Sequence, residues 1–354
     1  MITDNGDNIY VNITIEDPNQ SKRVPAEYRV TKTIPILPKS DDYYASVIKF
    51  TIPLDEIPLL VMPIIPNQPN PNLTPFVIGI STGGFDYPSN VIYNCENGLT
   101  PPVQNQPKQV VTEYYFVFEF ENLLQAINTA LAQAFLSSSL GGNAPYFYID
   151  VESGLINLVV DVANFATYPT NPPATIFINS SLQSYLNSFH YQYVGPSSIG
   201  KSYQFVLSRT GNNNMIPPFD PAGVQKRFIQ EYTTLPLWSS LRNILLTSSS
   251  MPISSEFTSS GNSGETTTFP IISEFTPQIE KSGDSRSVAY YVPSAQYRLI
   301  DLNSSTGLNT IDVKIYWQDK NSNIYPLYIS RFQQANIKLG FFKKSIYKGY
   351  WPRQ

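Results

Sequence analysis

The sequence contains few of the residues that carry acid–base, thiol or metal chemistry. Its 354 residues include one histidine, His190, and one cysteine, Cys95, and only 14% are Asp, Glu, Lys or Arg. Catalytic and metal sites draw mainly on these residue types. The composition therefore argues against an enzyme, a cofactor site or a metal centre, and a single cysteine excludes an intramolecular disulfide.

The sequence also lacks segments that would direct it to or across a membrane. Its N-terminus carries Asp4, Asn5 and Asp7 where a signal peptide would have a basic and then an apolar region. The longest apolar run, residues 57–65, is far shorter than the ~20 residues of a membrane-spanning helix, and prolines interrupt it. We therefore expect synthesis inside the cell, without a signal peptide or a membrane span.

Aromatic residues and prolines, in contrast, are plentiful: the chain has 24 Tyr, 20 Phe and 30 Pro. Short runs alternate apolar with polar residues and are bounded by Pro, Gly, Asn and Ser, which is the pattern of half-buried strands. Because the net charge is −4, no overall basic field would draw the molecule to nucleic acid. The sequence predicts an all-β protein.

Two hairpins stand out in this pattern. In residues 311–317 the apolar positions fall on one face, while Asp312 and Lys314 fall on the other, and residues 324–329 form the expected return strand. Residues 146–162 form the second expected hairpin, which turns at Glu152-Ser153-Gly154.

One segment has helical rather than strand periodicity. From Asn122 to Leu136, apolar residues recur every three or four positions. Asn122 with Gln125 resembles an N-terminal capping pair, and Gly141-Gly142 is expected to end the helix. We predict an amphipathic helix inserted between strands.

A weak internal repeat indicates how the chain divides. Residues 47–52 form a strand-like run that leads to Pro58-Leu59, and residues 241–246 form a similar run that leads to Pro252-Ile253. Chance is the alternative, because short apolar strands before prolines are common in all-β chains. The chain is also longer than a single core usually supports. We expect tandem β-sandwiches at residues 1–198 and 199–354, divided near Gly195–Ser202, with the helix in the first.

The residues that would have to carry chemistry stand apart from any recognisable motif. His190 lies among aromatic residues, so we expect it to be packed and hydrogen-bonded; Cys95 lies in a turn-like loop. Asp41-Asp42 and Asp55-Glu56 are adjacent carboxylates of the kind that glycosidases use, but they are explained more simply as solvated strand ends. We predict no catalytic, cofactor-binding or metal-binding residue.

The C-terminal residues 338–354 carry five cations, no acidic residue and five interleaved aromatics. Such a segment can contact nucleic acid through phosphates and base stacking. Alternatively, it is a last strand followed by a tail that docks on a neighbouring subunit, which is the interpretation we favour. The candidate assembly or nucleic-acid contacts are Lys338, Lys343, Lys344, Lys348, Trp351 and Arg353.

Three segments together resemble the jelly-roll capsid proteins of small viruses. They are residues 43–54 (YYASVIKFTIPL), the helix at 122–136, and residues 311–317 (IDVKIYW) with the return strand YPLY at 325–328. Within that group, the length and the repeat are most like the double jelly-roll major capsid proteins of the adenovirus and virophage lineage. In that lineage two sandwiches stand side by side, and three subunits form a pseudo-hexagonal capsomer. A single jelly-roll penton or minor capsid protein with an extra domain is the alternative.

The resemblance implies a tandem (double) jelly roll that self-assembles into capsomers of an icosahedral shell and resides in the virion. The implied partners are two further copies in a homotrimer, neighbouring capsomers and other capsid proteins, with local contact to the packaged genome. A receptor- or glycan-binding spike module and a β-sandwich glycosidase are the competing functions. The first would bind glycans as a discrete oligomer, and the second would hydrolyse them.

Overall fold

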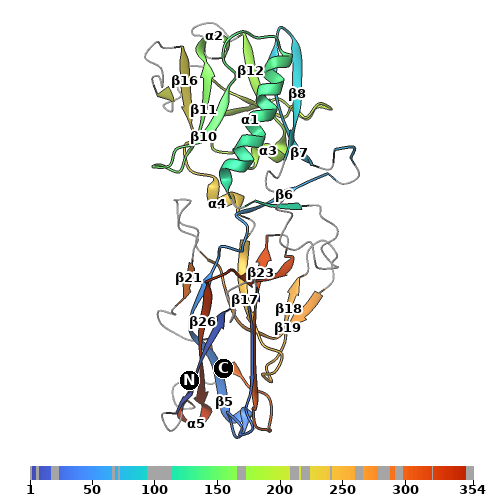
Figure 1. Cartoon of the computed structure of the whole chain (residues 1–354). Coiled ribbons are helices and arrows are strands. Elements are labelled where there is room, and N and C mark those ends of the chain that lie inside the picture. Colours follow the sequence, from blue (N-terminus) through green and yellow to red (C-terminus); the bar gives the residue numbers. More distant parts are fainter. Residues whose placement is uncertain are drawn as a thin grey trace. The chain divides into compact units, whose positions relative to one another are not determined.

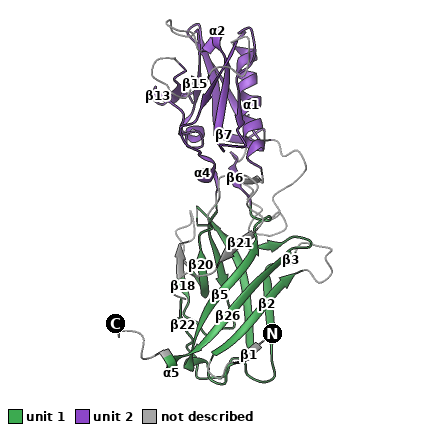
Figure 2. Cartoon of the chain, turned by 90° about the vertical axis from the view of Figure 1, so that its left-hand side faces the viewer, with its two compact units in different colours: residues 1–57, 240–279, 284–354 green, residues 58–239, 280–283 purple. Residues whose placement is uncertain are grey.

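The chain forms two compact units, which Figure 1 shows in a computed structural model and Figure 2 in separate colours. Unit 1 comprises residues 1–57, 240–279 and 284–354, and unit 2 comprises residues 58–239 and 280–283. Unit 2 is thus inserted into the sequence of unit 1. The structure describes residues 2–4, 8–16, 24–65, 68–70, 72–93, 114–117, 119–165, 173–207, 215–216, 224–239, 241–259, 266–277, 288–291, 298–320 and 322–347.

Unit 1 is a sandwich of two antiparallel sheets. The strands of the first, in spatial order, are β1 (Ile2–Asp4), β2 (Asn8–Glu16), β26 (Gln334–Lys343), β5 (Tyr43–Pro53) and β21 (Val288–Tyr291), with β22 (Ile300–Asp301) also on β5. Those of the second are β20 (Ile271–Phe275), β17 (Leu241–Thr247) and β23 (Thr310–Asp319), with β4 (Glu27–Thr31) and β24 (Ile324–Pro326) both on β23. The inner faces meet where the rings of Phe50 and Phe275 lie 4.3 Å apart.

The order of these strands is that of one jelly roll. Chain order gives eight main strands: β2, β4, β5, β17, β20, β21, β23 and β26. The first sheet places the first, eighth, third and sixth of them side by side, and the second sheet places the second, seventh, fourth and fifth. This is the eight-stranded, two-sheet jelly-roll arrangement, and unit 2 is inserted between its third and fourth strands.

Smaller elements complete unit 1. They are the paired strands β3 (Val24–Pro25) with β25 (Tyr328–Ile329) and β18 (Glu256–Ser259) with β19 (Thr266–Phe269), a 3-10 turn η1 (Ser40–Asp42) and the short helix α5 (Lys344–Tyr347).

Unit 2 has two sheets and a long helix around its own core. The five-stranded sheet contains β13 (Tyr191–Tyr193), β14 (Tyr203–Phe205), β12 (Ala174–Ile178), β7 (Leu73–Thr82) and β8 (Phe85–Ile92). The four-stranded sheet contains β10 (Tyr146–Ile149), β11 (Ile156–Asp161), β16 (Gln225–Ile229) and β15 (Met215–Ile216). The remaining elements are β6 (Leu60–Pro63) with β9 (Tyr114–Val117), α2 (Val162–Phe165), α3 (Ser180–Gln183) and α4 (Leu235–Trp238).

The long helix α1 (Phe120–Ser137) packs on β7, β8 and β10 (Figure 1). Leu124, Ile127, Leu131 and Phe135, the residues behind the predicted helical spacing, are all buried. The predicted ends are wrong, however. The N-cap position is Glu119 rather than Asn122, and the helix ends at Ser137, before the two glycines.

The described structure divides the chain differently from the predicted boundary at 198/199. The stretch 194–202 is the loop of the β13–β14 hairpin, closed by a 2.9 Å hydrogen bond from Val194 N–H to the Ser202 carbonyl. Gly195 and Gly200 have positive φ angles there, which glycine adopts without steric cost. Their role is to turn a hairpin, not to link domains.

The weak repeat has a related explanation. Its two runs are β5 and β17, which lie in the two different sheets of unit 1. They resemble each other because both are buried strands of one sandwich. The expected tandem double jelly roll is therefore corrected to one jelly roll with an inserted unit. The two predicted hairpins are confirmed as β23–β24 and β10–β11, except that residues 328–329 of the first predicted return strand pair with β3 instead.

We predict that Gly79→Ala destabilises unit 2. Gly79 lies on β7 opposite Phe177, and a Cβ at this position would overlap the Phe177 ring and lie 2.6 Å from the Tyr87 carbonyl oxygen. Forcing extra volume into a packed site costs about 1–3 kcal/mol. Gly141→Ala is the matched control, because no atom lies within 4 Å of its Cβ position. Urea unfolding monitored in unit 2 checks this; equal midpoints for the two variants would contradict it.

Candidate assembly site

The six predicted contact residues do not form one exposed tail. Lys338 and Lys343 belong to β26, which is paired with β2 on one side and β5 on the other, and Lys344 begins α5. Lys348, Trp351 and Arg353 lie outside the described residues. The first third of the predicted tail is thus a central strand of the jelly roll.

The aromatic residues of this strand serve the core of the subunit itself. Phe341 is 0% exposed and Phe342 is 5% exposed. The Phe342 ring meets Tyr10 of β2 edge-on, with ring centroids 6.2 Å apart. The aromatics of residues 338–354 are expected to be buried against another subunit or against the particle's contents; Phe341 and Phe342 are instead buried within their own subunit. Pairing with β2 on one edge and with β5 on the other places β26 in the interior of the sheet.

Two of the predicted lysines make contacts within unit 1. The Lys338 ammonium lies 4.8 Å from the centroid of the Tyr10 ring, a cation–π contact. The Lys344 ammonium lies 2.7 Å from the Asp301 carboxylate and 5.1 Å from the centroid of the Tyr44 ring. The side chain of Lys344 is only 17% exposed. These lysines fasten β26 and α5 to neighbouring strands.

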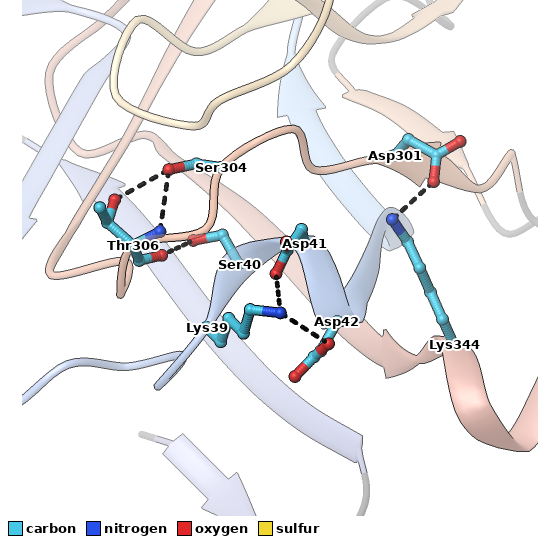
Figure 3. A network of polar contacts seen from close by, with 8 residues as sticks. All are labelled: Lys39, Ser40, Asp41, Asp42, Asp301, Ser304, Thr306 and Lys344. Carbon is cyan, nitrogen blue, oxygen red and sulfur yellow. Dashed lines mark hydrogen bonds and ion pairs between the residues drawn. The ribbon is translucent and has the colours of Figure 1, made fainter.

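Figure 3 shows Lys344 beside a second set of polar contacts. The Ser40 hydroxyl and backbone N–H both donate to the Thr306 carbonyl, at 2.9 and 3.0 Å, and the hydroxyls of Ser304 and Thr306 lie 2.8 Å apart. These hydrogen bonds join η1 to the segment that follows β22. Lys344 lies near the end of the described residues. Through its ion pair with Asp301 it is therefore attached to the segment that these hydrogen bonds hold in place.

The adjacent carboxylates are engaged in ordinary contacts. Asp41 and Asp42 flank the Lys39 ammonium at 3.3 and 3.8 Å. Glu56 accepts a 2.5 Å hydrogen bond from the Ser330 hydroxyl. Exposed ion pairs of the first kind contribute little to stability, about 0–1 kcal/mol. Asp41, Asp42 and Glu56 thus make the contacts expected of carboxylates at strand ends and in loops.

His190 and Cys95 have different outcomes. His190 is exposed, directly before β13, rather than packed as expected, and its carbonyl accepts a 2.9 Å hydrogen bond from Val206 N–H. Cys95 lies outside the described residues.

Among the residues that the structure describes, no group of three or more His, Cys, Asp or Glu is placed to hold a metal ion. No helix in the described parts of the chain is long and apolar enough to cross a membrane.

A buried carboxylate, Asp312 of β23, was not singled out from the sequence as a site. Asp312 is 3% exposed, although it alternates along the strand with the apolar residues Ile311 and Val313. It accepts hydrogen bonds from the hydroxyls of Ser248, Ser249 and Ser250, at 2.6, 2.5 and 2.5 Å, and from the N–H groups of Ser249 and Ser250, at 3.1 and 2.7 Å. The three consecutive serines after an apolar strand were the available signal.

Burial by itself would raise the pKa of Asp312, but the hydrogen bonds from the three serines favour the ionised form and hold its pKa well below the usual range. The network closes the turn after β17 against β23. It therefore stabilises the jelly roll.

Comparison with known proteins places this architecture among virus capsids. A model of the family described as "Sputnik minor capsid protein V18/19" matches residues 9–344. The chain is 33% identical over 155 residues to an uncharacterized protein V18 of Sputnik virophage, covering 40% of this chain and 92% of that protein. It is 28% identical over 211 residues to the structural protein V19 of the same virophage, covering 57% of this chain and 95% of that protein.

Two solved structures share the fold. A chain from the 3.5 Å cryo-EM structure of the Sputnik virophage superposes with a TM-score of 0.82 at 29% identity, covering 96% of this chain and 99% of that chain. The penton protein of mavirus superposes with a TM-score of 0.67 at 17% identity, covering 95% of this chain and 99% of that chain. The resemblance to jelly-roll viral capsid proteins is confirmed.

We predict that Asp312→Asn destabilises unit 1 by roughly 2–4 kcal/mol at pH 7, because an amide cannot satisfy five donors aimed at a carboxylate. The depressed pKa means that the contribution is present above the unfolded-state pKa of about 3.9 and is lost as the pH falls through the lower folded-state value. The gap in unfolding free energy between wild type and variant should therefore narrow below about pH 4.

The control for this series is Asp301→Asn, which removes the exposed partner of Lys344 and should cost less than about 1 kcal/mol. Urea unfolding between pH 3 and pH 7 provides the comparison. A gap for Asp312→Asn that stays constant with pH, or one as small as for Asp301→Asn, would refute the account of this carboxylate.

Proposed function

This chain belongs to the Sputnik minor capsid protein V18/19 family, and from that premise we propose that it is a penton-type subunit whose copies form a capsomer of an icosahedral shell. Its relatives are structural components of the virophage capsid. The observation that carries the finer proposal is the strand order of unit 1, which forms one jelly roll and not two.

The number of jelly rolls changes the expected stoichiometry. The expected homotrimer depended on two rolls in each subunit, which give three subunits a pseudo-hexagonal outline. With one roll in each subunit, a trimer presents only three rolls. Closed rings of single-roll subunits instead suit the rotational axes of a shell, and the fivefold axis is the one that a penton occupies. The similarity in fold to the mavirus penton protein supports this choice.

The partners that follow from this proposal are other copies of the chain within the ring and other capsid proteins around it. Because the family is described as one of minor capsid proteins, a major capsid component is the expected second partner. Genome contact through Lys338 and Lys344 has less support, because both ammonium groups lie against aromatic rings of unit 1.

We further propose that residues 348–354, which follow α5, form an assembly element. Lys344 fixes the preceding helix through Asp301 and Tyr44. The remaining residues include Lys348, Tyr350, Trp351 and Arg353. Two large aromatics in so short a segment favour burial against a partner, because such side chains anchor interfaces.

The purified full chain is expected to form a pentamer of about 200 kDa, five times the 39.8 kDa of one subunit. Native mass spectrometry with light scattering measures this. A ring of five supports the penton proposal. A stable trimer, or a monomer at every accessible concentration, would contradict it, and glycan binding by a discrete oligomer other than a ring of five would favour the spike-module alternative.

Deleting residues 348–354 is expected to leave the unfolding midpoint of unit 1 unchanged and to weaken association at least tenfold. Tyr350→Ala with Trp351→Ala should reproduce the loss, whereas Lys348→Ala with Arg353→Ala should not, if aromatic docking is responsible. Lys344→Ala is the control, because the contacts of Lys344 lie inside the subunit. This variant shows how much a change within the fold alone weakens association. Normal association of the deleted chain would eliminate the proposed element.

A further inference from the structure

The turn between β25 and β26 holds a phenylalanine in an unfavourable backbone conformation. Phe332 has a φ angle of 63°, in the left-handed region that bulky residues avoid. It occupies the third position of a four-residue turn, which the Gln333 N–H closes by donating to the Ser330 carbonyl at 3.2 Å. Glycine or asparagine is usual at a position of this kind.

Nothing inside the described subunit compensates for this choice of residue. The Phe332 side chain is 78% exposed, so it buries little apolar surface. The other non-glycine residues with positive φ among the described residues are Ser139 and Ser322, both small and polar. A large aromatic side chain at a position suited to glycine thus costs stability and gains almost no burial within the fold.

The turn is nevertheless firmly held on both sides. Before it, Ile329 is buried and pairs with Val24 of β3, and after it Gln334 pairs with Glu16 of β2. The Ser330 hydroxyl donates to the Glu56 carboxylate at 2.5 Å. Phe332 is therefore presented in a fixed position, which lowers the entropy lost when such a side chain is buried in a partner.

We propose that Phe332 is an interface anchor that inserts into an apolar recess on the neighbouring copy of this chain in the capsomer. The inference rests on the proposed function, because it takes the ring of identical subunits as its setting. In such a ring each surface feature of one copy faces a different, fixed patch of the next copy. A single, rigidly held aromatic suits that repeated contact.

The residue beside the anchor favours the same occupant. Arg331 is exposed next to Phe332, and aromatic residues and arginine are the types that dominate interface energetics. Each copy carries a net charge of −4, so a local cation at the contact opposes repulsion between copies. Both neighbouring side chains thus serve association with a second copy.

The decisive variant is Phe332→Gly, because the proposal predicts opposite effects on folding and on association. Glycine relieves the positive φ angle, so the unfolding midpoint of the dissociated subunit should stay the same or rise. Loss of the anchor should raise the subunit concentration at which the ring dissociates at least tenfold. Chemical unfolding of dilute subunits and mass photometry over a dilution series provide the two readouts.

Two controls separate the side chain from the backbone. Ser139→Gly relieves the same kind of backbone conformation without removing an aromatic, and it should leave association unchanged. Phe332→Tyr keeps the aromatic ring and should retain association within about threefold of the wild type.

Unchanged association of Phe332→Gly, with the wild-type ring intact, would overturn the anchor and leave the penton proposal standing. A drop in the unfolding midpoint of the dissociated Phe332→Gly subunit would also overturn it, because the ring would then be needed within its own chain. A wild-type chain that forms no ring would overturn both proposals together.

Discussion

Unit 1 depends on the position of its last strand, β26, between its first long strand, β2, and β5. Residues 334–342 of β26 pair with residues 16–8 of β2, and the other edge of β26 pairs with β5. Without β26, both neighbours would present unpaired backbone groups, and the buried Ile337, Leu339 and Phe341 would leave the core. The two ends of the sequence therefore have to meet before the jelly roll can close. An insertion between its third and fourth strands is tolerated because unit 2 has a core of its own.

The shortage of chemically active residues and the wealth of aromatics fit a protein selected for shape. Aromatic side chains fill both cores, as Phe50 with Phe275 in unit 1 and Phe147 with Phe205 in unit 2 illustrate. Buried polar groups such as Asp312 hold turns in place. Two local features are proposed for association: the Phe332 turn and the residues that follow α5. In this proposal the sheets provide rigidity, and turns and termini provide the contacts with neighbouring subunits.

Strand character, the two hairpins and α1 could be predicted from the sequence because they rest on local periodicity. The division into units could not, because β5 and β17 belong to the two sheets of one sandwich although unit 2 separates them along the chain. The glycines of 194–202 signal a turn, but a hairpin loop and a linker share that composition. At the candidate site, the charge of Lys338 and Lys344 was evident, whereas their aromatic and acidic partners, Tyr10 and Asp301, come from distant strands. The strain at Phe332 is a property of the backbone and has no signature in composition.

The claim that β26 closes a jelly roll independent of unit 2 is tested most directly by hydrogen exchange in two truncated chains. One ends at Tyr347 and retains β26; the other ends at Phe332 and lacks it. The account predicts that amides of β2 and β5 lose protection in the shorter chain, while those of α1 and β11 in unit 2 keep the protection that they have in the longer one. Retained protection of β2 and β5 without β26, or loss of protection across both units, would contradict it.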